Sequence, residues 1–324
     1  MPDAPPSQGQ AAGSRGGRRT LVIGCGFIGS NVAVHIASGG SPLTVLTRSR
    51  PSPEVAAAIS SARLLLGDAS DPKLLAAALE GVDDVAFCAG GLLPAASERD
   101  PERDRQLTLE PVRTVLAALR ERPGVTLTYL SSGGTVYGEP ARLPVRESDP
   151  AMPVTSYGAL HLECEEEIGR ARREHELEAR ILRCSTVYGE HQRPDRGQGV
   201  IATFLHRISR GEAIDVYGDG STIRDYVYAA DVARVMTAMI GHGQPPPVIN
   251  VGSGEGSSLL HVLALAERAV GRSAEIRRHP EREFDIHQIV LDTTLLHETV
   301  EIEMTPLAEG IERTRRWLGA GGTA

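Results

Sequence analysis

A short apolar segment that ends in a glycine-rich turn constrains this chain more than any other feature. Leu21, Val22 and Ile23 form the segment, residues 24–29 (GCGFIG) form the turn, and a helix-compatible stretch follows at 30–38. In a strand–turn–helix unit of this kind, the first glycine permits the tight turn and the second lets the backbone approach a pyrophosphate. The third lets the helix pack on the strand, and the helix N-terminus attracts phosphate. The pattern predicts a dinucleotide site, with an ordinary glycine-rich turn as the alternative.

Size and charge narrow the class of protein. The chain has 324 residues, a net charge of −8 and a pI of about 5.7, enough for one large α/β domain or two unequal lobes. The acidic balance argues against nucleic acid or an anionic membrane as the main partner, and no apolar run approaches transmembrane length. The four cysteines lack metal-ligand spacing, so we expect no metal and reduced thiols in a cytoplasmic protein. They are Cys25, Cys88, Cys164 and Cys184.

Strands and helices alternate after the first turn. Residues 1–19 are rich in Pro, Gly, Ser, Gln and Arg without an apolar signal segment, and are expected to form a disordered tail. Strands are expected at 43–46, 63–66, 84–88, 125–130 and 178–183, and helices at 72–80, 101–122 and 157–175. This order predicts an α/β fold, a Rossmann-type doubly wound parallel sheet over residues 20–189. Residues 190–324 are expected to form mainly a smaller C-terminal α/β substrate lobe, with some later segments returning to the first domain. A further strand is expected at 248–252. We also expect Asp71 and Asp231 to cap the helices that follow them.

The end of the second strand bears on the choice of cofactor. NAD-binding domains commonly carry an acid there for the ribose hydroxyls, whereas this chain has Thr47, Arg48, Ser49 and Arg50. A hydroxyl and two cations suit the 2′-phosphate of NADP(H), although a solvated basic loop gives the same pattern. Both NAD and NADP(H) stay open.

Two other strand ends are also suited to a dinucleotide. Asp68 follows the third strand and could accept a hydrogen bond from the adenine amino group. Ala89 and Gly90 follow the fourth strand, where small residues would let the cofactor lie against the backbone.

Motifs spread along the chain carry a family resemblance. They are residues 26–30, 67–68, 131–138, 157–158, 187–189, 197–204, 218–227, 231–232 and 250–254. Together they resemble the extended short-chain dehydrogenase/reductase family, and within it the nucleotide-sugar epimerases, dehydratases and 4-ketoreductases of the UDP-glucose 4-epimerase type. The resemblance covers nearly the whole chain from Thr20. It implies a nucleotide-diphosphate sugar as substrate and hydride transfer between a sugar carbon and the nicotinamide.

In that family a Tyr-x-x-x-Lys pair and a nearby Ser or Thr assist the chemistry. Tyr157 matches the tyrosine by position. Because a free phenol has a pKa of about 10, it needs a cationic neighbour to ionise near neutral pH, and a spacing of four residues puts both groups on one helix face.

The chain departs from the family pattern at four positions. His161 stands where the lysine belongs, and histidine, with a pKa of about 6.5, is shorter and largely neutral at pH 7. Gly133 occupies the usual Ser/Thr position, where the adjacent Ser132 could substitute. Thr186 replaces a common asparagine, and Ile23 replaces the first glycine of the usual turn, which Gly24 restores.

The resemblance assigns further residues to the site. The implied catalytic residues are Tyr157, His161 and Ser132. The implied cofactor-binding residues are Gly24, Gly26, Phe27, Ile28, Gly29, Thr47, Arg48, Ser49, Asp68, Ala69, Ala89, Gly90, Ser131, Tyr157, His161 and Cys184. The implied substrate-binding residues are Gly133, Thr186 and Arg224, the last with a guanidinium suited to a diphosphate.

Several readings of the function stay open. The main one is an NAD(P)-dependent enzyme that transfers hydride at C4 of a nucleotide-activated hexose, either a 4-epimerase, which is an isomerase, or a 4-ketoreductase, which is an oxidoreductase. The alternative is a weak or catalytically retired member that binds dinucleotide as a structural or sensing protein. By resemblance we also expect a homodimer formed through the helices expected at 101–122 and 157–175. The base, the sugar and the pathway are not specified by the sequence.

Overall fold

The computed structural model describes residues 17–196, 199–243, 245–281 and 286–321. Residues 1–16 of the expected tail lie outside this part, and so does Gly197 of the motif at 197–204.

Seven parallel strands form the central sheet. They are β1 (Thr20–Ile23), β2 (Leu43–Thr47), β3 (Arg63–Leu66), β4 (Asp84–Phe87), β5 (Thr126–Ser132), β6 (Ala179–Cys184) and β10 (Val248–Val251). Their order across the sheet is β10-β6-β5-β4-β1-β2-β3, and every neighbouring pair is parallel. The order 3-2-1-4-5-6 is that of the doubly wound dinucleotide fold, so the predicted Rossmann-type sheet is confirmed. The seventh strand comes from the second half of the chain.

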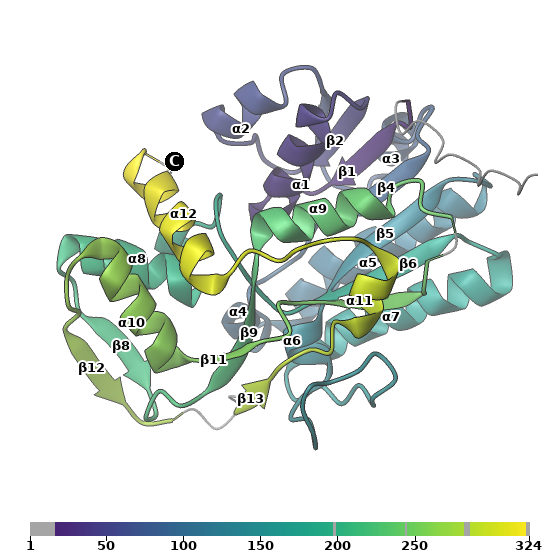
Figure 1. Ribbon diagram of the computed structural model, residues 1–324. Helices are drawn as coiled ribbons and strands as arrows, with labels where there is room; N and C mark the ends of the chain where they lie inside the picture. Colours follow the sequence, from purple (N-terminus) through teal and green to yellow (C-terminus); the bar gives the residue numbers. More distant parts are fainter. Residues whose placement is uncertain (1–16, 197–198, 244, 282–285, 322–324) are drawn as a thin grey trace, which may run out of the picture.

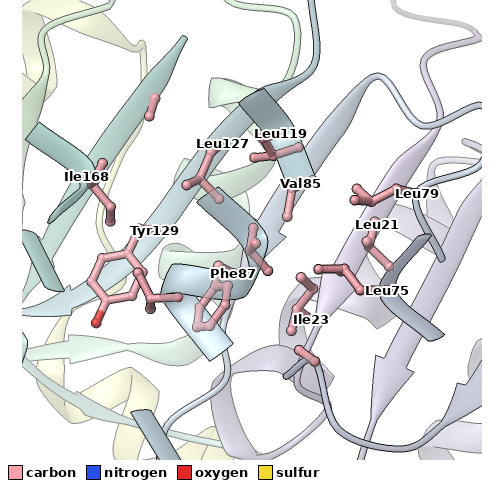
Figure 2. Close-up of a cluster of buried hydrophobic side chains, with 14 of the residues drawn as sticks. Leu21, Ile23, Leu75, Leu79, Val85, Phe87, Leu119, Leu127, Tyr129 and Ile168 are labelled. Atoms are coloured by element: carbon pink, nitrogen blue, oxygen red, sulfur yellow. The ribbon is translucent and has the colours of Figure 1, made fainter. Parts of the chain in front are cut away.

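Helices cover both faces of this sheet (Figure 1). One layer contains α3 (Pro72–Ala78), α5 (Pro101–Arg120) and α7 (Ser156–His175). The other contains α1 (Phe27–Ser38), α2 (Pro53–Ala58), α9 (Ala229–Met239) and α11 (Thr294–Thr299). Between strands and the first layer lies the apolar cluster of Figure 2, in which Leu21, Phe87 and Leu127 of the sheet meet Leu75 and Ile168 of the helices. Most of these strands are buried on both faces, which explains their near-continuous apolar runs. The edge strand β3 differs, because three of its four residues are exposed.

A second, smaller group of elements lies at the left of Figure 1. Its helices are α8 (Val200–Arg210), α10 (Leu259–Val270) and α12 (Leu307–Gly319). Its strands are β7 (Thr186–Tyr188), β9 (Ile223–Tyr228), β11 (Gly256–Ser258) and β13 (Gln288–Ile289), which form one sheet, and the pair β8 (Ile214–Tyr217) and β12 (Ile276–His279). These elements share a separate apolar core that includes Ile201, Phe204 and Val262. Short helices α4 (Pro94–Ser97), α6 (Gly133–Val136) and η1 (Pro194–Arg196) lie in the loops.

Side-chain caps fix where several helices begin. Asp71 accepts hydrogen bonds from the N–H groups of Lys73 (2.9 Å) and Leu74 (3.3 Å), as predicted. The prediction for Asp231 is wrong, because β9 runs straight into α9 and Tyr228 is the N-cap. Asp231 instead accepts hydrogen bonds from Thr305 N (2.6 Å) and Thr305 Oγ1 (2.9 Å) and ties the C-terminal segment to α9. No helix in the described part combines the length and apolar character that a membrane span requires.

Candidate active site

The glycine turn between β1 and α1 is shaped by close backbone packing. Gly24 has a φ of +89°, and a Cβ on it would lie 2.6 Å from Cα of Ala89. A Cβ on Gly29 would lie 1.9 Å from the carbonyl oxygen of Gly24. Both positions therefore exclude any side chain, and they hold α1 against β1 and against the loop after β4.

Gly26, by contrast, faces open space. A Cβ there would meet nothing within 4 Å, and Gly26 is the N-cap of α1 without a side-chain hydrogen bond to the helix. The first turn of α1 carries no acid, so its free N–H groups and its dipole are available to an anion. Phe27 and Ile28 follow, half-buried. These residues fit the pyrophosphate of a dinucleotide.

The end of β2 contacts the same turn. Oγ1 of Thr47 accepts a hydrogen bond from Cys25 N (3.4 Å) and donates to the Ser49 carbonyl (3.3 Å). Arg48 donates to the Gly90 carbonyl (3.2 Å), so its side chain reaches from β2 to the loop after β4. Ser49 and Arg50 are exposed. The structure thus brings Thr47, Arg48 and Gly90 together beside the glycine turn.

Two more predicted cofactor residues lie at the end of β3. One carboxylate oxygen of Asp68 accepts hydrogen bonds from Ser70 N (2.9 Å) and Ser70 Oγ (2.8 Å), and Ala69 is buried. At the end of β4, Ala89 is half-buried against Gly24 and Gly90 is exposed.

Tyr157 and His161 lie together on the first turns of α7. Thr155 caps this helix at Gly158 N (3.1 Å), and the ring centroids of Tyr157 and His161 are 4.5 Å apart. His161 is buried, and its Nδ1 lies 3.1 Å from the hydroxyl of Tyr129 on β5. The four-residue spacing therefore places both groups on one face, as predicted.

Burial disfavours the charged form of both groups. It raises the pKa of Tyr157 to about 12, with a further contribution from the negative charge of Asp104. Burial lowers the pKa of His161 to about 4, and Asp104 opposes this shift. Because its pKa lies well below 7, His161 does not supply the positive charge of the missing lysine at neutral pH. The charged side chain that affects the pKa of both rings is the acid Asp104.

Ser132 lies at the end of β5, near the start of α7. Oγ1 of Thr135 donates to Oγ of Ser132 (2.8 Å), and a Cβ on Gly158 would lie 2.7 Å from the Thr135 carbonyl oxygen. The turn that holds Ser132 therefore packs against the residue that follows Tyr157. Gly133 has no room for a hydroxyl-bearing side chain, since a Cβ there would lie 2.8 Å from the Arg183 carbonyl oxygen.

Ser131 and Cys184 point away from the loops of the site. Oγ of Ser131 donates to Glu165 (2.5 Å), which also pairs with Arg183 (2.6 Å). Cys184 is buried in the apolar cluster under α1 and α9. These two residues can face a cofactor through their backbone only.

The predicted substrate residues come from three elements. Gly133 begins α6 and Thr186 begins β7, and a Cβ on Gly134 would lie 3.9 Å from Oγ1 of Thr186. Arg224 lies half-buried on β9, where it donates to the carbonyls of Ile223 (2.9 Å) and His287 (3.4 Å). The structure therefore brings Gly134, the neighbour of Gly133, close to Thr186 and fixes the Arg224 guanidinium against backbone carbonyls.

Sequence reasoning missed Asp104 and Tyr129. Asp104 is buried on α5 in a stripe that continues through Thr108, Val112 and Val115. An acid on the apolar face of a predicted helix is a signal that could have identified it. Tyr129 gives a weaker signal, since a buried strand tolerates a tyrosine for packing alone.

The chain is similar to known proteins over most of its length. The family model described as "NAD dependent epimerase/dehydratase family" matches residues 20–252. A UDP-glucose 4-epimerase of Mycolicibacterium smegmatis is 31% identical over 305 residues, covering 91% of this chain and 97% of that protein. A dTDP-4-dehydro-6-deoxy-D-allose reductase of a Streptomyces species is 28% identical and covers 93% of this chain and 96% of its own. The solved UDP-glucose 4-epimerase of Thermotoga maritima with UDP-glucose superposes with a TM-score of 0.88 at 28% identity, covering 94% of this chain and 99% of that one.

Proposed function

The chain belongs to the NAD-dependent epimerase/dehydratase family, and on that premise we propose that it is a nucleotide-sugar 4-epimerase. Such an enzyme inverts the hydroxyl at C4 of a hexose linked to a nucleoside diphosphate. The placement of Tyr157 and His161, ring centroids 4.5 Å apart, on the helix that starts beside the Ser132 turn supports hydride-transfer chemistry at a sugar. The observation that carries the choice of a 4-epimerase is the match to a UDP-glucose 4-epimerase, 31% identical over 91% of the chain.

The residues of the glycine turn would hold the dinucleotide. Gly26 and the free N–H groups of α1 would take its pyrophosphate, and Thr47, Arg48 and Asp68 would contact its adenosine half. The bound dinucleotide would accept the hydride from the sugar and later return it. Tyr157 would exchange a proton with the sugar oxygen, Ser132 would hydrogen-bond to that oxygen, and Arg224 would bind the diphosphate.

A 4-ketoreductase is the second candidate, favoured by the cations at the end of β2. Arg48 and Arg50 are both exposed there, where NAD-binding domains commonly have an acid. They would bind the 2′-phosphate of NADPH. The 28% identical dTDP-keto-sugar reductase supports this candidate.

The first experiment identifies the nucleotide released by denaturing freshly purified protein. We expect close to one NAD(H) per chain, together with interconversion of UDP-glucose and UDP-galactose without added cofactor. An empty site that binds NADPH more tightly than NADH, with reduction of a 4-keto sugar, would replace the epimerase by the ketoreductase. An Arg48→Ala, Arg50→Ala double variant should then lose affinity for NADPH and not for NADH.

A non-catalytic role remains the contrasting hypothesis, and one variant separates it from the proposal. Tyr157→Phe should abolish turnover and leave dinucleotide binding within about threefold. Activity that survives this change would remove Tyr157 from the proposed mechanism. A wild-type chain that binds dinucleotide and converts no nucleotide sugar would favour the sensing or structural role.

The homodimer expected from the resemblance is also a proposal. α5 and α7 lie side by side, and Arg113 of α5 pairs with Glu167 of α7 (2.9 Å). Two copies of this helix pair would form a four-helix interface. Light scattering on the purified chain tests this directly: a mass near 69 kDa, about twice that of one 34.5 kDa chain, is expected, and a monomer would contradict it.

A further inference from the structure

His161 is held by a hydroxyl from the sheet. The Tyr129 ring lies in the apolar cluster of Figure 2, and its hydroxyl, which points away from Leu127, lies 3.1 Å from Nδ1 of His161. The thiol of Cys164, three residues after His161 on α7, also lies near this hydroxyl. A hydroxyl donates only one proton. When that proton goes to the sulfur of Cys164, the Tyr129 oxygen accepts a hydrogen bond from Nδ1–H, and Nε2 keeps its lone pair.

Asp104 adds a buried negative charge to the same region. Its Oδ1 accepts hydrogen bonds from Leu92 N (2.7 Å) and Oγ1 of Thr108 (3.0 Å). Its Oδ2 is buried and has no hydrogen-bond partner among the residues that the structure describes. A buried carboxylate oxygen without a partner is unfavourable. Its position on α5, which packs beside α7, brings its charge to bear on both Tyr157 and His161.

We propose that Tyr129 and Asp104 are positioning residues that make His161 the proton acceptor for Tyr157, in place of the missing lysine. The inference rests on the proposed function. When the sugar hydroxyl is oxidised, the hydride on C4 would pass to the bound dinucleotide, and the O–H proton moves to the phenol oxygen of Tyr157. The phenol's own proton moves to Nε2 of His161. The imidazole becomes an imidazolium, held by the Tyr129 oxygen at Nδ1 and stabilised by Asp104. Reduction of the keto sugar reverses both transfers, so no proton is gained or lost over a full epimerisation.

The pKa values favour this route over a permanently ionised phenol. At pH 7 a pKa of about 12 for Tyr157 leaves roughly one phenol in 100,000 ionised. A pKa of about 4 for His161 leaves roughly one imidazole in 1,000 protonated. Both groups are therefore neutral at pH 7, and the neutral imidazole keeps a lone pair that can accept the phenol's proton.

Three other acids on or beside α7 are held by hydrogen bonds or ion pairs. Glu98 at the end of α4 accepts hydrogen bonds from Ser156 N (2.6 Å) and Ser156 Oγ (3.1 Å). Glu165 pairs with Arg183 from β6, and Glu163 pairs with Arg105. Asp104 is the acid whose charge acts on both Tyr157 and His161.

The first test needs no activity. Nitrogen-15 NMR of histidine-labelled protein, assigned by loss of signals in His161→Gln, reports the tautomer and the pKa of His161. We expect a proton on Nδ1 and a bare Nε2 in the wild type, a mixture of tautomers in Tyr129→Phe, and a lower pKa in Asp104→Asn. A proton on Nε2 in the neutral wild type, or an unchanged pKa in Asp104→Asn, would overturn the proposal.

The second test uses the sign of a rate change. Removing the Asp104 charge makes His161 harder to protonate but makes Tyr157 easier to ionise. Proton acceptance by His161 therefore predicts that Asp104→Asn lowers kcat about 10-fold to 100-fold with little change in KM. A rise in kcat, with the pH profile shifted to lower pH, would show that ionised Tyr157 acts alone and would refute the proposal.

Matched controls separate this effect from lost stability. Glu102→Gln removes an exposed charge from the same helix, and Tyr188→Phe removes a buried phenol hydroxyl from the second lobe. The kcat of both variants should stay within about twofold of the wild-type value.

If Asp104→Asn fails to fold, Tyr129→Phe carries the test, since it should also lower kcat about tenfold. A wild type without turnover contradicts the proposed function, and the NMR result then decides on the His161 arrangement alone.

Discussion

Glu165 of α7 and Arg183 of β6 form an ion pair in the interior of the protein. Arg183 donates two hydrogen bonds from Nε (3.1 and 3.0 Å) and one from a terminal nitrogen (2.6 Å), and the two side chains are only 4% and 9% exposed. Oγ of Ser131 adds a third donor to Glu165, and the guanidinium lies over the Tyr137 ring at 4.8 Å. Burial opposes the charge on Arg183, but Glu165 outweighs it and raises the arginine pKa.

Breaking this pair should destabilise the fold strongly. Glu165→Ala leaves an uncompensated cation in the interior, and we expect it to lower the free energy of unfolding by about 3–5 kcal/mol. Urea denaturation followed by circular dichroism measures the change. Glu110→Ala is the matched control, because its pair with Arg113 (3.2 Å) lies on the surface and should contribute less than about 1 kcal/mol. If both substitutions lower the free energy of unfolding by the same amount, the buried pair contributes no more to stability than the surface pair.

The two later glycines of the turn should separate stability from binding. Gly29→Ala places a methyl group against the Gly24 carbonyl at 1.9 Å and should lower the Tm by several degrees or prevent folding. Gly26→Ala puts the methyl group into open space at a φ of −83°, which alanine adopts readily. That variant should keep its Tm and lose at least about tenfold in affinity for the dinucleotide.

Isothermal titration with NAD and with NADPH, beside thermal unfolding of both variants, tests these expectations. If the Gly26→Ala chain binds either dinucleotide as well as the wild type does, the pyrophosphate does not bind at the N-terminus of α1.

The sheet could be predicted from the sequence and much of the site chemistry could not. The apolar run 21–23, the glycine turn and the alternation that follows are local patterns, so they gave the Rossmann-type sheet and the position of Tyr157. The capping prediction for Asp231 failed because its true partner, Thr305, is 74 residues away. Asp104 and Tyr129 were missed for a related reason. Their effect on His161 depends on how α5 and β5 pack against α7, which no local spacing encodes.

Restoring the family lysine should reveal how strongly Tyr157 depends on a cation. His161→Lys places an ammonium one helical turn from the phenol, and that charge lowers the phenol pKa. We expect kcat at pH 7 to rise about tenfold and the rising limb of the pH–rate profile to shift to lower pH. The chain has one natural lysine, Lys73 on α3, so no other ammonium masks the change.

A pH–rate profile of wild type, His161→Lys and His161→Gln distinguishes the possibilities. An unchanged profile in the lysine variant of an active protein would mean that position 161 does not act on Tyr157. A glutamine variant as fast as the wild type would exclude proton acceptance by His161.

The low pKa of His161 should also appear in the stability of the protein. In the unfolded chain His161 takes up a proton with a pKa of about 6.5, whereas in the folded chain burial lowers this pKa to about 4. Between these values the unfolded state binds one more proton, so stability falls as the pH falls. His161 should therefore remove about 3 kcal/mol from the free energy of unfolding between pH 7 and pH 4, at about 1.4 kcal/mol per pH unit once the pH is below 6.5.

Urea titrations of wild type and His161→Gln at several pH values isolate this contribution, because the other groups titrate alike in both chains. The difference in stability between the two proteins should narrow or reverse in favour of the glutamine variant as the pH drops. A difference that stays constant from pH 7 to pH 4 would mean that His161 is as easily protonated in the fold as in the unfolded chain, and the buried hydrogen bond to Tyr129 would then need another explanation.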